Sequence, residues 1–331
     1  MSATGDLIIT NGDVAGELLR RALPGAEVLP WRDVLHDGPV PLTPNLEDLT
    51  AIRAEYLAGA GGGELGAIIY ELTSRDRGIA YSASFDRAAL WFEHDLYDQL
   101  QLLQVLDWFA ANPRNDQSLL LVQAENYIGR ETLETIAELA RSEIPVSQEQ
   151  LDLAQNAWLA FRQATPEPWT QLLQEDLSAL PFLRQAVLRM LEELPGPDGL
   201  SRTERQLLAA AQPGTLTALA LFIAVQRQEE AEFMGDWTFW RLLDQLALAG
   251  EPLIEGLEAA PFQHDAPDLA EPYLKSVVRL TPLGKDVLAG RADWAAFNGI
   301  DRWWGGTHLT EDALWRWDFA TQRLIASNDS R

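Results

Sequence analysis

The chain has 331 residues, 47% hydrophobic and 23% charged, which is enough apolar material for a buried core shared by two or three domains. Its formal net charge of -25 argues against tight nonspecific binding of nucleic acid, and no apolar run approaches the roughly 20 residues that cross a bilayer. Because the sequence has no cysteine and no secretion signal, we expect a cytoplasmic protein without disulfides, thiolate zinc sites or cysteine nucleophiles.

The first 140 residues alternate short apolar runs with stretches of helical periodicity. The runs predict strands at residues 6–10, 27–30, 88–92 and 118–123. The periodic stretches predict helices at residues 14–23, 46–57 and from 96 to about 108, and residues 63–82 stay undecided. Strands that alternate with helices imply right-handed crossovers, so residues 1–140 are predicted to form a small Rossmann-like α/β domain with a mostly parallel sheet.

The rest of the chain is predicted to be mainly α-helical. Residues 141–196 are interpreted as a helical linker region, which ends in the break PGPDG at residues 195–199. Ser201 and Glu204 then have the spacing of a helix-capping box. A helix is predicted to begin at this box, further helices at residues 216–234, 236–249 and 285–289, and strands at residues 252–255 and 276–280. This order is that of a winged helix, so residues 197–331 are interpreted as a winged-helix-like domain.

This C-terminal domain ends in a tryptophan-rich tail. The tail contains Trp303, Trp304, Trp315 and Trp317. Without accompanying basic residues, such an aromatic stretch indicates packing of the tail onto the protein rather than stacking of nucleic-acid bases.

Three polar signatures follow directly after predicted strands. They are Asn11-Gly12-Asp13, Trp31-Arg32-Asp33 and Glu93-His94-Asp95. In an open α/β sheet, ligands bind outside the carboxyl ends of the strands, so we expect these residues to lie around one site.

Four acids in these signatures are candidate metal ligands, namely Asp13, Asp33, Glu93 and Asp95. Unpaired carboxylates crowded at one edge repel each other, and their pKa values rise unless a cation joins them. Oxygen ligands indicate Mg²⁺ or Mn²⁺, and these ions suit phosphate or phosphoester chemistry because they neutralise charge and activate water.

Other residues of the same region are candidates for proton transfer and ligand binding. His94, which lies between two acids, and Asp33 are the candidate catalytic groups. The turn before residue 14 leads into a helix N-terminus, whose amides favour an anion such as phosphate, although the acid in that turn opposes this. The predicted ligand-binding residues are Asn11, Gly12, Trp31, Arg32, His36 and Arg53.

Three of the four acids also have a structural interpretation, and the sequence leaves the metal-binding and the structural role of each open. Asp13 and Asp95 each stand where they could cap a following helix. Asp33 could form an ion pair with Arg32 or Arg53.

The presumed recognition helix of the winged-helix-like module is poorly equipped to bind DNA. Residues 236–245 contain Arg241 against Asp236 and Asp244. This charge favours protein contacts or domain packing. Arg241, Lys275, Arg279 and Lys285 keep DNA binding open as the less favoured alternative.

Several strings in the chain resemble a bacterial family of unknown function, the domain-of-unknown-function 1835 family. In the first domain they are TNGD at residues 10–13, LPWRDVLHDGP at 29–39 and LWFEHDLYDQL at 90–100. In the C-terminal part they are GLSRTE at residues 199–204 and DRWWGG at 301–306. The resemblance implies an architecture and marked positions, but no activity.

Two functional hypotheses follow. In the first, the strand-end pocket binds Mg²⁺ or Mn²⁺ and a small phosphate-bearing ligand, with a nucleotide as one candidate, and phosphoester hydrolysis would make the protein a metal-dependent hydrolase. In the second, the protein is a non-enzymatic regulator that senses a ligand and contacts a protein or DNA through its winged-helix-like module.

Overall fold

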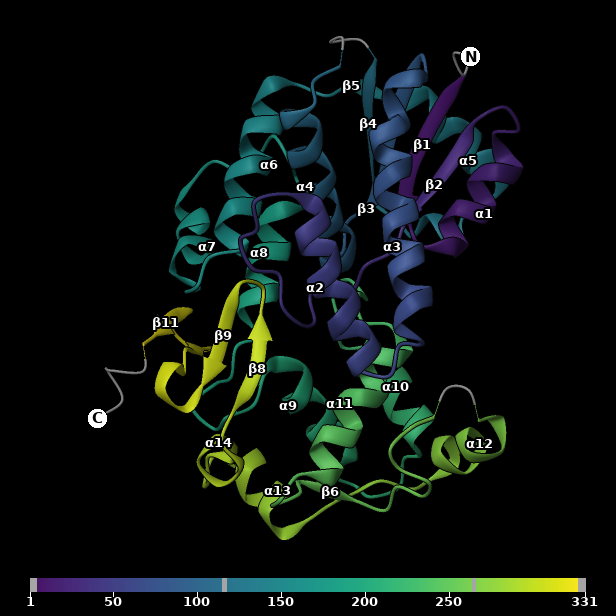
Figure 1. The fold of residues 1–331 in the computed structure, drawn as a ribbon. Helices are drawn as coiled ribbons and strands as arrows, with labels where there is room; N and C mark the ends of the chain where they lie inside the picture. The colour runs from purple at the N-terminus through teal and green to yellow at the C-terminus, as the bar shows by residue number, and fades with distance from the viewer. Residues whose placement is uncertain (1–4, 115–117, 264–265, 327–331) are drawn as a thin grey trace. The chain divides into compact units, whose positions relative to one another are not determined.

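The computed structural model describes residues 5–114, 118–263 and 266–326, and it divides into two compact units (Figure 1). The first unit comprises Met1–Leu188 and Trp303–Thr307, and the second comprises Arg189–Arg302 and His308–Arg331. The helices after residue 140, interpreted from the sequence as a separate linker region, belong to the first unit as far as Leu188. The predicted α/β class is confirmed.

A five-stranded sheet in the order β2-β1-β3-β4-β5 forms the centre of the first unit. Its strands are β1 (Asp6–Asn11), β2 (Glu27–Trp31), β3 (Arg87–Glu93), β4 (Leu119–Ala124) and β5 (Ile144–Pro145). The first four are parallel and match the predicted strands, whereas the two-residue β5 pairs antiparallel with β4 and was not predicted. Since Ile8 lies level with Val28 and Ala89, the carboxyl ends of the parallel strands gather at one edge.

Helices cover both faces of this sheet. Those of the first unit are α1 (Asp13–Ala22), α2 (Leu46–Gly59), α3 (Leu65–Ala80), α4 (Leu96–Ala111), α5 (Leu133–Leu139), α6 (Gln148–Phe161), α7 (Glu167–Gln171) and most of α8 (Leu183–Leu191). Leu19 of α1 and Ile136 of α5 share one core cluster with Ile8 and Trp91 of the sheet. On the other face, α4 packs between β3 and α6, so its apolar residues are buried on nearly all sides.

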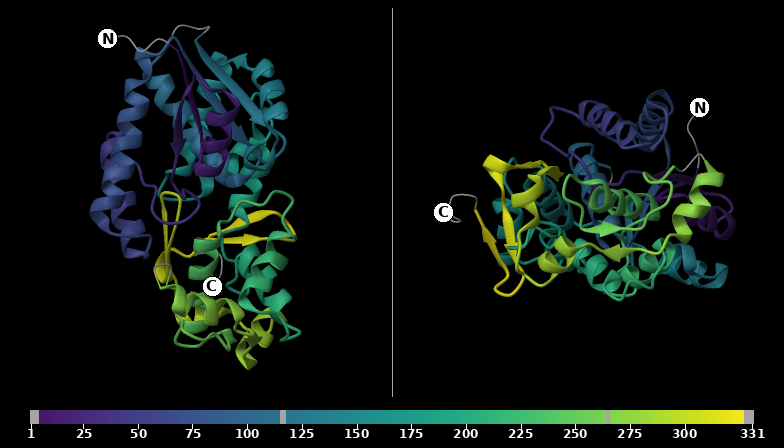
Figure 2. Two further views of the ribbon diagram at one scale, coloured as in Figure 1. Left: turned by 90° about the vertical axis from the view of Figure 1, so that its right-hand side faces the viewer. Right: turned by 90° about the horizontal axis from the view of Figure 1, so that it is seen from below.

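The undecided stretch, residues 63–82, contains the long helix α3. This helix lies beside α2 as a helical hairpin and packs on β2 (Figures 1 and 2). Gly78 of α3 lies so close to Leu29 that a Cβ atom at this position would meet the leucine side chain. Exposed Ile69 and Tyr70 weaken the amphipathic pattern of α3, which explains why periodicity alone did not identify this helix.

The second unit is mainly helical. Its elements are α9 (Arg202–Ala211), α10 (Ala218–Gln226), α11 (Asp236–Leu248), β6 (Ile254–Glu255), α12 (Pro267–Lys275), β7 (Arg279–Leu280), α13 (Pro282–Leu288), α14 (Trp294–Asn298) and the pair β10 (Arg316–Asp318) and β11 (Arg323–Ile325). The hairpin strands β8 (Asp301–Trp304) and β9 (Thr307–Thr310) are shared by both units, because Trp303–Thr307 belongs to the first. Ser201 and Glu204 form both halves of the predicted capping box. The strand β6 follows three helices and pairs antiparallel with β7, as predicted, but the helix α12 between the two strands was not predicted. The winged-helix assignment stays a prediction.

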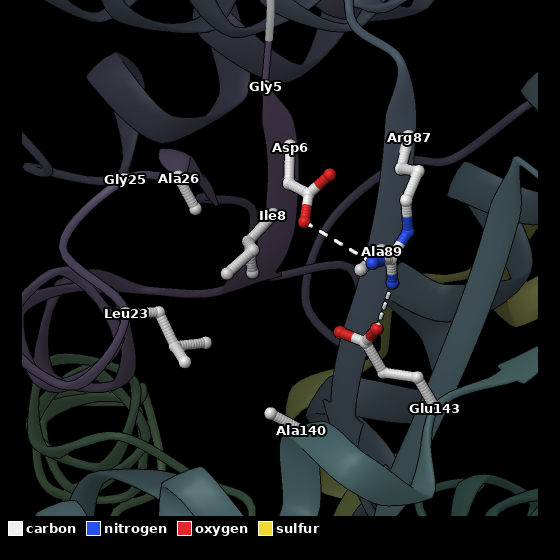
Figure 3. A pocket seen from close by; sticks show the side chains of 10 residues that line it. All are labelled: Gly5, Asp6, Ile8, Leu23, Gly25, Ala26, Arg87, Ala89, Ala140 and Glu143. Atoms are coloured by element: carbon white, nitrogen blue, oxygen red, sulfur yellow. Dashed lines mark hydrogen bonds and ion pairs between the residues drawn. The ribbon is translucent and has the colours of Figure 1, made fainter.

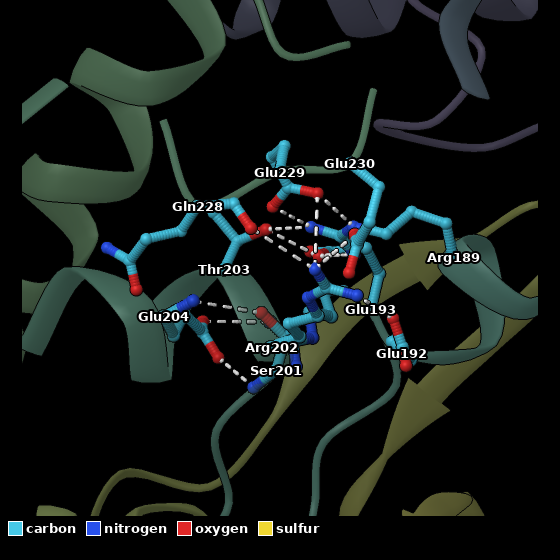
Figure 4. A network of polar contacts seen from close by, with 11 residues as sticks. Arg189, Glu192, Glu193, Ser201, Arg202, Thr203, Glu204, Gln228, Glu229 and Glu230 are labelled. Atoms are coloured by element: carbon cyan, nitrogen blue, oxygen red, sulfur yellow. Dashed lines mark hydrogen bonds and ion pairs between the residues drawn. The ribbon is translucent and has the colours of Figure 1, made fainter. Parts of the chain in front are cut away.

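One predicted helix of the second unit is too long. Helicity was expected over residues 216–234, but α10 ends at Gln226. Beyond it, Glu229 accepts hydrogen bonds from Arg189, and Glu230 accepts one from Arg202 (Figure 4). These long-range ion pairs hold residues 227–235 in a non-helical path, and local periodicity carries no signal for them.

Two of the four tail tryptophans are buried, and Trp303 and Trp315 are half-buried. Trp304 is 2% exposed and lies edge-on against Phe161 and Trp169 of the same unit. Trp317 in the second unit is fully buried. Within the described part of the chain, no helix combines the length and the apolar character of a membrane span.

Candidate metal centre at the sheet edge

The three polar signatures lie at the same edge of the sheet. Asn11 is the last residue of β1, Trp31 the last of β2 and Glu93 the last of β3. Along the chain, β2 and β3 are added on opposite sides of β1, so the strand order reverses between β1 and β3. In doubly wound sheets, the crevice at such a reversal is where ligands bind.

An acidic cluster occupies this junction. Glu93, Asp95 and Asp98 each place a ligand oxygen within 4.8 Å of the others, and all three residues are buried. Glu93 ends β3, Asp95 is the N-cap of α4, and Asp98 lies in the first turn of that helix. Among the described residues, no other group of three or more acidic or histidine side chains is close enough together to share a metal ion. The cluster contains two of the four predicted ligands.

Backbone amides and Asn11 hold the three carboxylates in place. Asp95 caps α4 by accepting a hydrogen bond from the Asp98 amide at 3.1 Å. Asp98 accepts one from the Glu93 amide at 2.7 Å and another from Asn11 Nδ2 at 2.5 Å. Glu93 Oε1 accepts from the Ile128 amide at 2.7 Å. The ends of β1 and β3, the start of α4 and the turn that follows β4 therefore all contribute to the cluster.

The burial of these acids shifts their protonation. Desolvation raises the pKa of Glu93 to about 7, against the lowering effect of hydrogen bonds from Ile128 and Asn11. Desolvation and the charge of Glu93 together raise the pKa of Asp95 to about 7. The pKa of Asp98 also lies well above its ordinary value, mainly because of burial. Near neutral pH the cluster therefore holds protons that a bound cation would displace.

Sequence reasoning missed Asp98. The prediction took only the residues that directly follow each strand, and Asp98 lies one helical turn further on. The available signal was its spacing, since residues i and i+3 of a helix lie on the same face and Asp95 precedes Asp98 by three.

Asp13 was predicted as a metal ligand but lies outside the cluster. It is the first residue of α1 and forms an ion pair with Arg32 at 2.5 Å, with side-chain exposures of 67% and 46%. Gly12 is the N-cap of α1, and no side chain caps this helix. Arg32 therefore neutralises Asp13 beside a helix N-terminus whose first amides have no side-chain partner.

Asp33, predicted as a catalytic group and metal ligand, is also outside the cluster. It is fully buried and accepts hydrogen bonds from Arg53 at 2.8 and 3.0 Å. Arg53, predicted to bind ligand, also donates to the carbonyl groups of Val34, Asp37 and Pro39. This ion pair holds the loop after β2, so both residues are used in the fold.

Trp31, another predicted ligand contact, is buried in the same region. Its indole Nε1 donates to Gln104 of α4 at 2.8 Å, and Arg75 stacks over its ring at 4.3 Å. With no exposed surface, the side chain joins β2 to α4.

The tight loop after β2 depends on Gly38. Its φ is +82°, and a Cβ atom there would overlap the ring of Tyr56. We expect Gly38→Ala to lower the free energy of unfolding by about 1 to 3 kcal/mol, because strain and overlap add. Urea denaturation measures this loss. Gly59→Ala, which would meet nothing within 4 Å, is the control, and an equal loss in both variants would contradict the explanation.

The two histidines predicted at the site lie in aromatic surroundings. The His94 ring is 5.1 Å from the Tyr127 ring and 5.9 Å from the Phe182 ring, and the histidine is not part of the acidic cluster. Burial lowers the pKa of His94, so the ring is neutral at pH 7. His36 is 8% exposed and lies edge-on to Tyr97 at 6.0 Å.

Two hollows lie away from the acidic cluster. One, of about 440 Å³, is at the opposite edge of the sheet, where Arg87 pairs with Asp6 and Glu143 (Figure 3). The other, of about 470 Å³, is in the second unit, where Arg302 pairs with Glu204. In both, the arginine is already bound to acids of the fold. We therefore place the site by its converging carboxylates rather than by the size of a hollow.

Several arginines of the second unit contact other side chains of the same unit. Arg189 pairs with Glu193 and Glu229, and Arg202 pairs with Glu192 and Glu230 (Figure 4). In the presumed recognition helix α11, Arg241 lies over Trp237 at 4.9 Å. These contacts engage three arginines within the unit, and DNA binding by the winged-helix-like module stays a prediction.

No protein-family model matches the chain, and no curated protein is similar to it. The resemblance to the domain-of-unknown-function 1835 family therefore stays a prediction.

Proposed function

We propose that the first unit binds one Mg²⁺ or Mn²⁺ ion through Glu93, Asp95 and Asp98 and, through that ion, a small phosphate-bearing ligand. The observation that carries the proposal is the position of three buried carboxylates within 4.8 Å of one another, where the strand order reverses. Three buried acids are tolerated only if they hold protons or a cation.

The donor set favours a hard divalent ion. All three groups are carboxylates, and the chain has no cysteine to supply a softer ligand. Magnesium and manganese prefer such oxygen ligands and commonly bridge protein carboxylates to a phosphate.

The start of α1 supports the phosphate part of the proposal. Its N-cap is Gly12, and the uncapped amides of a helix N-terminus attract anions. The opposing charge of Asp13 is balanced by Arg32. Asn11, directly before Gly12, donates to Asp98, so this helix begins beside the acidic cluster.

Isothermal calorimetry at about pH 8, above the pKa of about 7 of Glu93 and Asp95, tests the metal site. We expect one Mn²⁺ per wild-type chain and an affinity loss of at least about 10-fold in Asp98→Asn. Asp107→Asn is the matched control, because Asp107 is on the same helix and has a pKa raised by burial but lies outside the cluster. The metal site is refuted if the wild type takes up neither ion.

A second titration tests the ligand. Inorganic phosphate is added to the wild type with and without saturating Mn²⁺. Binding that requires the ion supports the bridging role. Phosphate binding of equal strength without the ion would overturn the bridge and leave the metal site standing.

A further inference from the structure

We propose that Asn11 supplies a fourth oxygen ligand, its side-chain carbonyl, to the cation held by Glu93, Asp95 and Asp98. The inference rests on the proposed function and extends it, because it makes the metal a bridge between β1 and β3. Neither the acidic cluster nor the strand-end signature assigns this role to the residue.

The first observation is the position of the Asn11 amide. Its Nδ2 donates to Asp98 Oδ2 at 2.5 Å, and the side chain also forms a hydrogen bond with Glu93. Amide C–N and C=O bonds of about 1.33 and 1.23 Å keep Oδ1 within about 2.6 Å of Nδ2. Oδ1 of Asn11 therefore lies within roughly 5 Å of Asp98 Oδ2, a separation that two ligands of one ion can have.

The second observation is independent of the acids. Asn11 Oδ1 is buried and has no hydrogen-bond partner among the described residues. A carbonyl oxygen that is buried without a donor is costly, and it is also a ligand type that hard cations accept. The nitrogen of the amide faces the carboxylate, which leaves the oxygen for a positively charged or donating guest.

The hydroxyl group of the neighbouring Thr10 also lacks a hydrogen-bond partner among the described residues. Thr10 is fully buried. Thr10 lies level with Trp91 in the sheet, so the alternation of side chains places it on the same face as Glu93, two residues further along β3. The orphan hydroxyl of Thr10 thus lies on the face of Glu93, whereas Asn11, the next residue, reaches Asp98 at the start of α4.

The absence of cysteine from the chain allows a direct test with Asn11→Cys. Thiolate is a soft ligand, and its bond to Co²⁺ produces a sulfur-to-metal charge-transfer absorption. If residue 11 touches the ion, Co²⁺ added to this variant gives that band. The wild type gives none, and Asp107→Cys, a cysteine on α4 outside the cluster, also gives none.

Two further variants test the role of Asn11 even if the cysteine variant does not fold. We expect Asn11→Ala to bind Mn²⁺ at least about 10-fold more weakly than the wild type, and Asn11→Asp, which keeps an oxygen, to bind at least as tightly as the wild type. Circular dichroism checks that each variant is folded.

The outcomes separate the two claims. The role of Asn11 is refuted, and the metal site is retained, if two results occur together. The wild type binds Mn²⁺, and a folded Asn11→Cys variant binds Co²⁺ without the charge-transfer band. Equal Mn²⁺ affinities of Asn11→Ala and wild type overturn the role of Asn11 too. A wild type that binds no metal overturns both.

Discussion

Replacing Arg53 by methionine is expected to lower the free energy of unfolding by about 3 to 5 kcal/mol. Such a loss follows when one partner of a buried ion pair is removed and the other charge stays buried. Here Asp33 would lose the guanidinium 2.8 Å away and keep only the longer contact with Arg75 at 3.5 Å. The carbonyl groups of Val34, Asp37 and Pro39 would also lose their donor. Urea denaturation of wild type and variant measures the difference.

Arg32→Met is the control for this prediction. Its ion pair with Asp13 is exposed, so we expect a change below about 1 kcal/mol. Adding Asp33→Leu to Arg53→Met should recover part of the stability, because the stranded charge is removed. A loss below 1 kcal/mol in Arg53→Met would show that the pair does not hold the loop.

The acidic cluster predicts an unusual dependence of stability on pH. The pKa of Glu93 rises from 4.5 to about 7 and that of Asp95 from 3.8 to about 7, so between these values the folded state holds protons that the unfolded state has released. The cluster's contribution to the free energy of unfolding therefore falls as pH rises from about 4 to about 7. Burial raises the pKa of Asp98 in the same direction.

Comparison with Glu93→Gln isolates this effect from other titrating groups. Glutamine mimics the protonated acid and does not titrate. Between pH 5 and pH 8, the free energy of unfolding of the variant should therefore rise relative to that of the metal-free wild type by on the order of 3 kcal/mol, because each pKa unit corresponds to about 1.4 kcal/mol. Urea denaturation at both pH values measures it. A variant that loses stability relative to wild type as pH rises would contradict the raised pKa.

Bound Mn²⁺ should counteract the loss of stability that the wild type shows as pH rises. At pH 8, ion at about 100 times its dissociation constant should stabilise the folded state by about 2.7 kcal/mol. At pH 5 the same concentration should stabilise it much less, because protons occupy the carboxylates. Stabilisation of equal size at both pH values would place the ion elsewhere.

The strands and the site edge were predictable because local patterns determine them. Apolar runs such as residues 7–9 and 88–92 are buried on both faces of a parallel sheet, and polar residues follow where those runs end. The convergence of Asn11 and Glu93 on one edge then follows from the parallel topology alone.

The roles of individual acids were not predictable from the sequence. Asp33 and Asp95 both follow apolar strands, but Asp33 is paired with Arg53, 20 residues away, and with Arg75, whereas no arginine of the described chain forms an ion pair with Asp95. Which acid receives an arginine depends on how α2 packs, and a strand-end pattern carries no information on that. The same limit applies to residues 227–235, where ion pairs formed across the second unit replaced an expected helix.

A crystal structure with bound Mn²⁺ tests the central claim most directly, because anomalous scattering locates the ion independently of any affinity. We expect one anomalous peak at the end of β3, at about 2.0 to 2.3 Å from carboxylate oxygens of Glu93, Asp95 and Asp98, the range of bond lengths for hard divalent ions. The metal site would be refuted by crystals grown at pH 8 with saturating Mn²⁺ if they showed no peak between these residues. The hydrogen bonds of the carboxylates with the Ile128 amide and with Asn11 would then be unchanged.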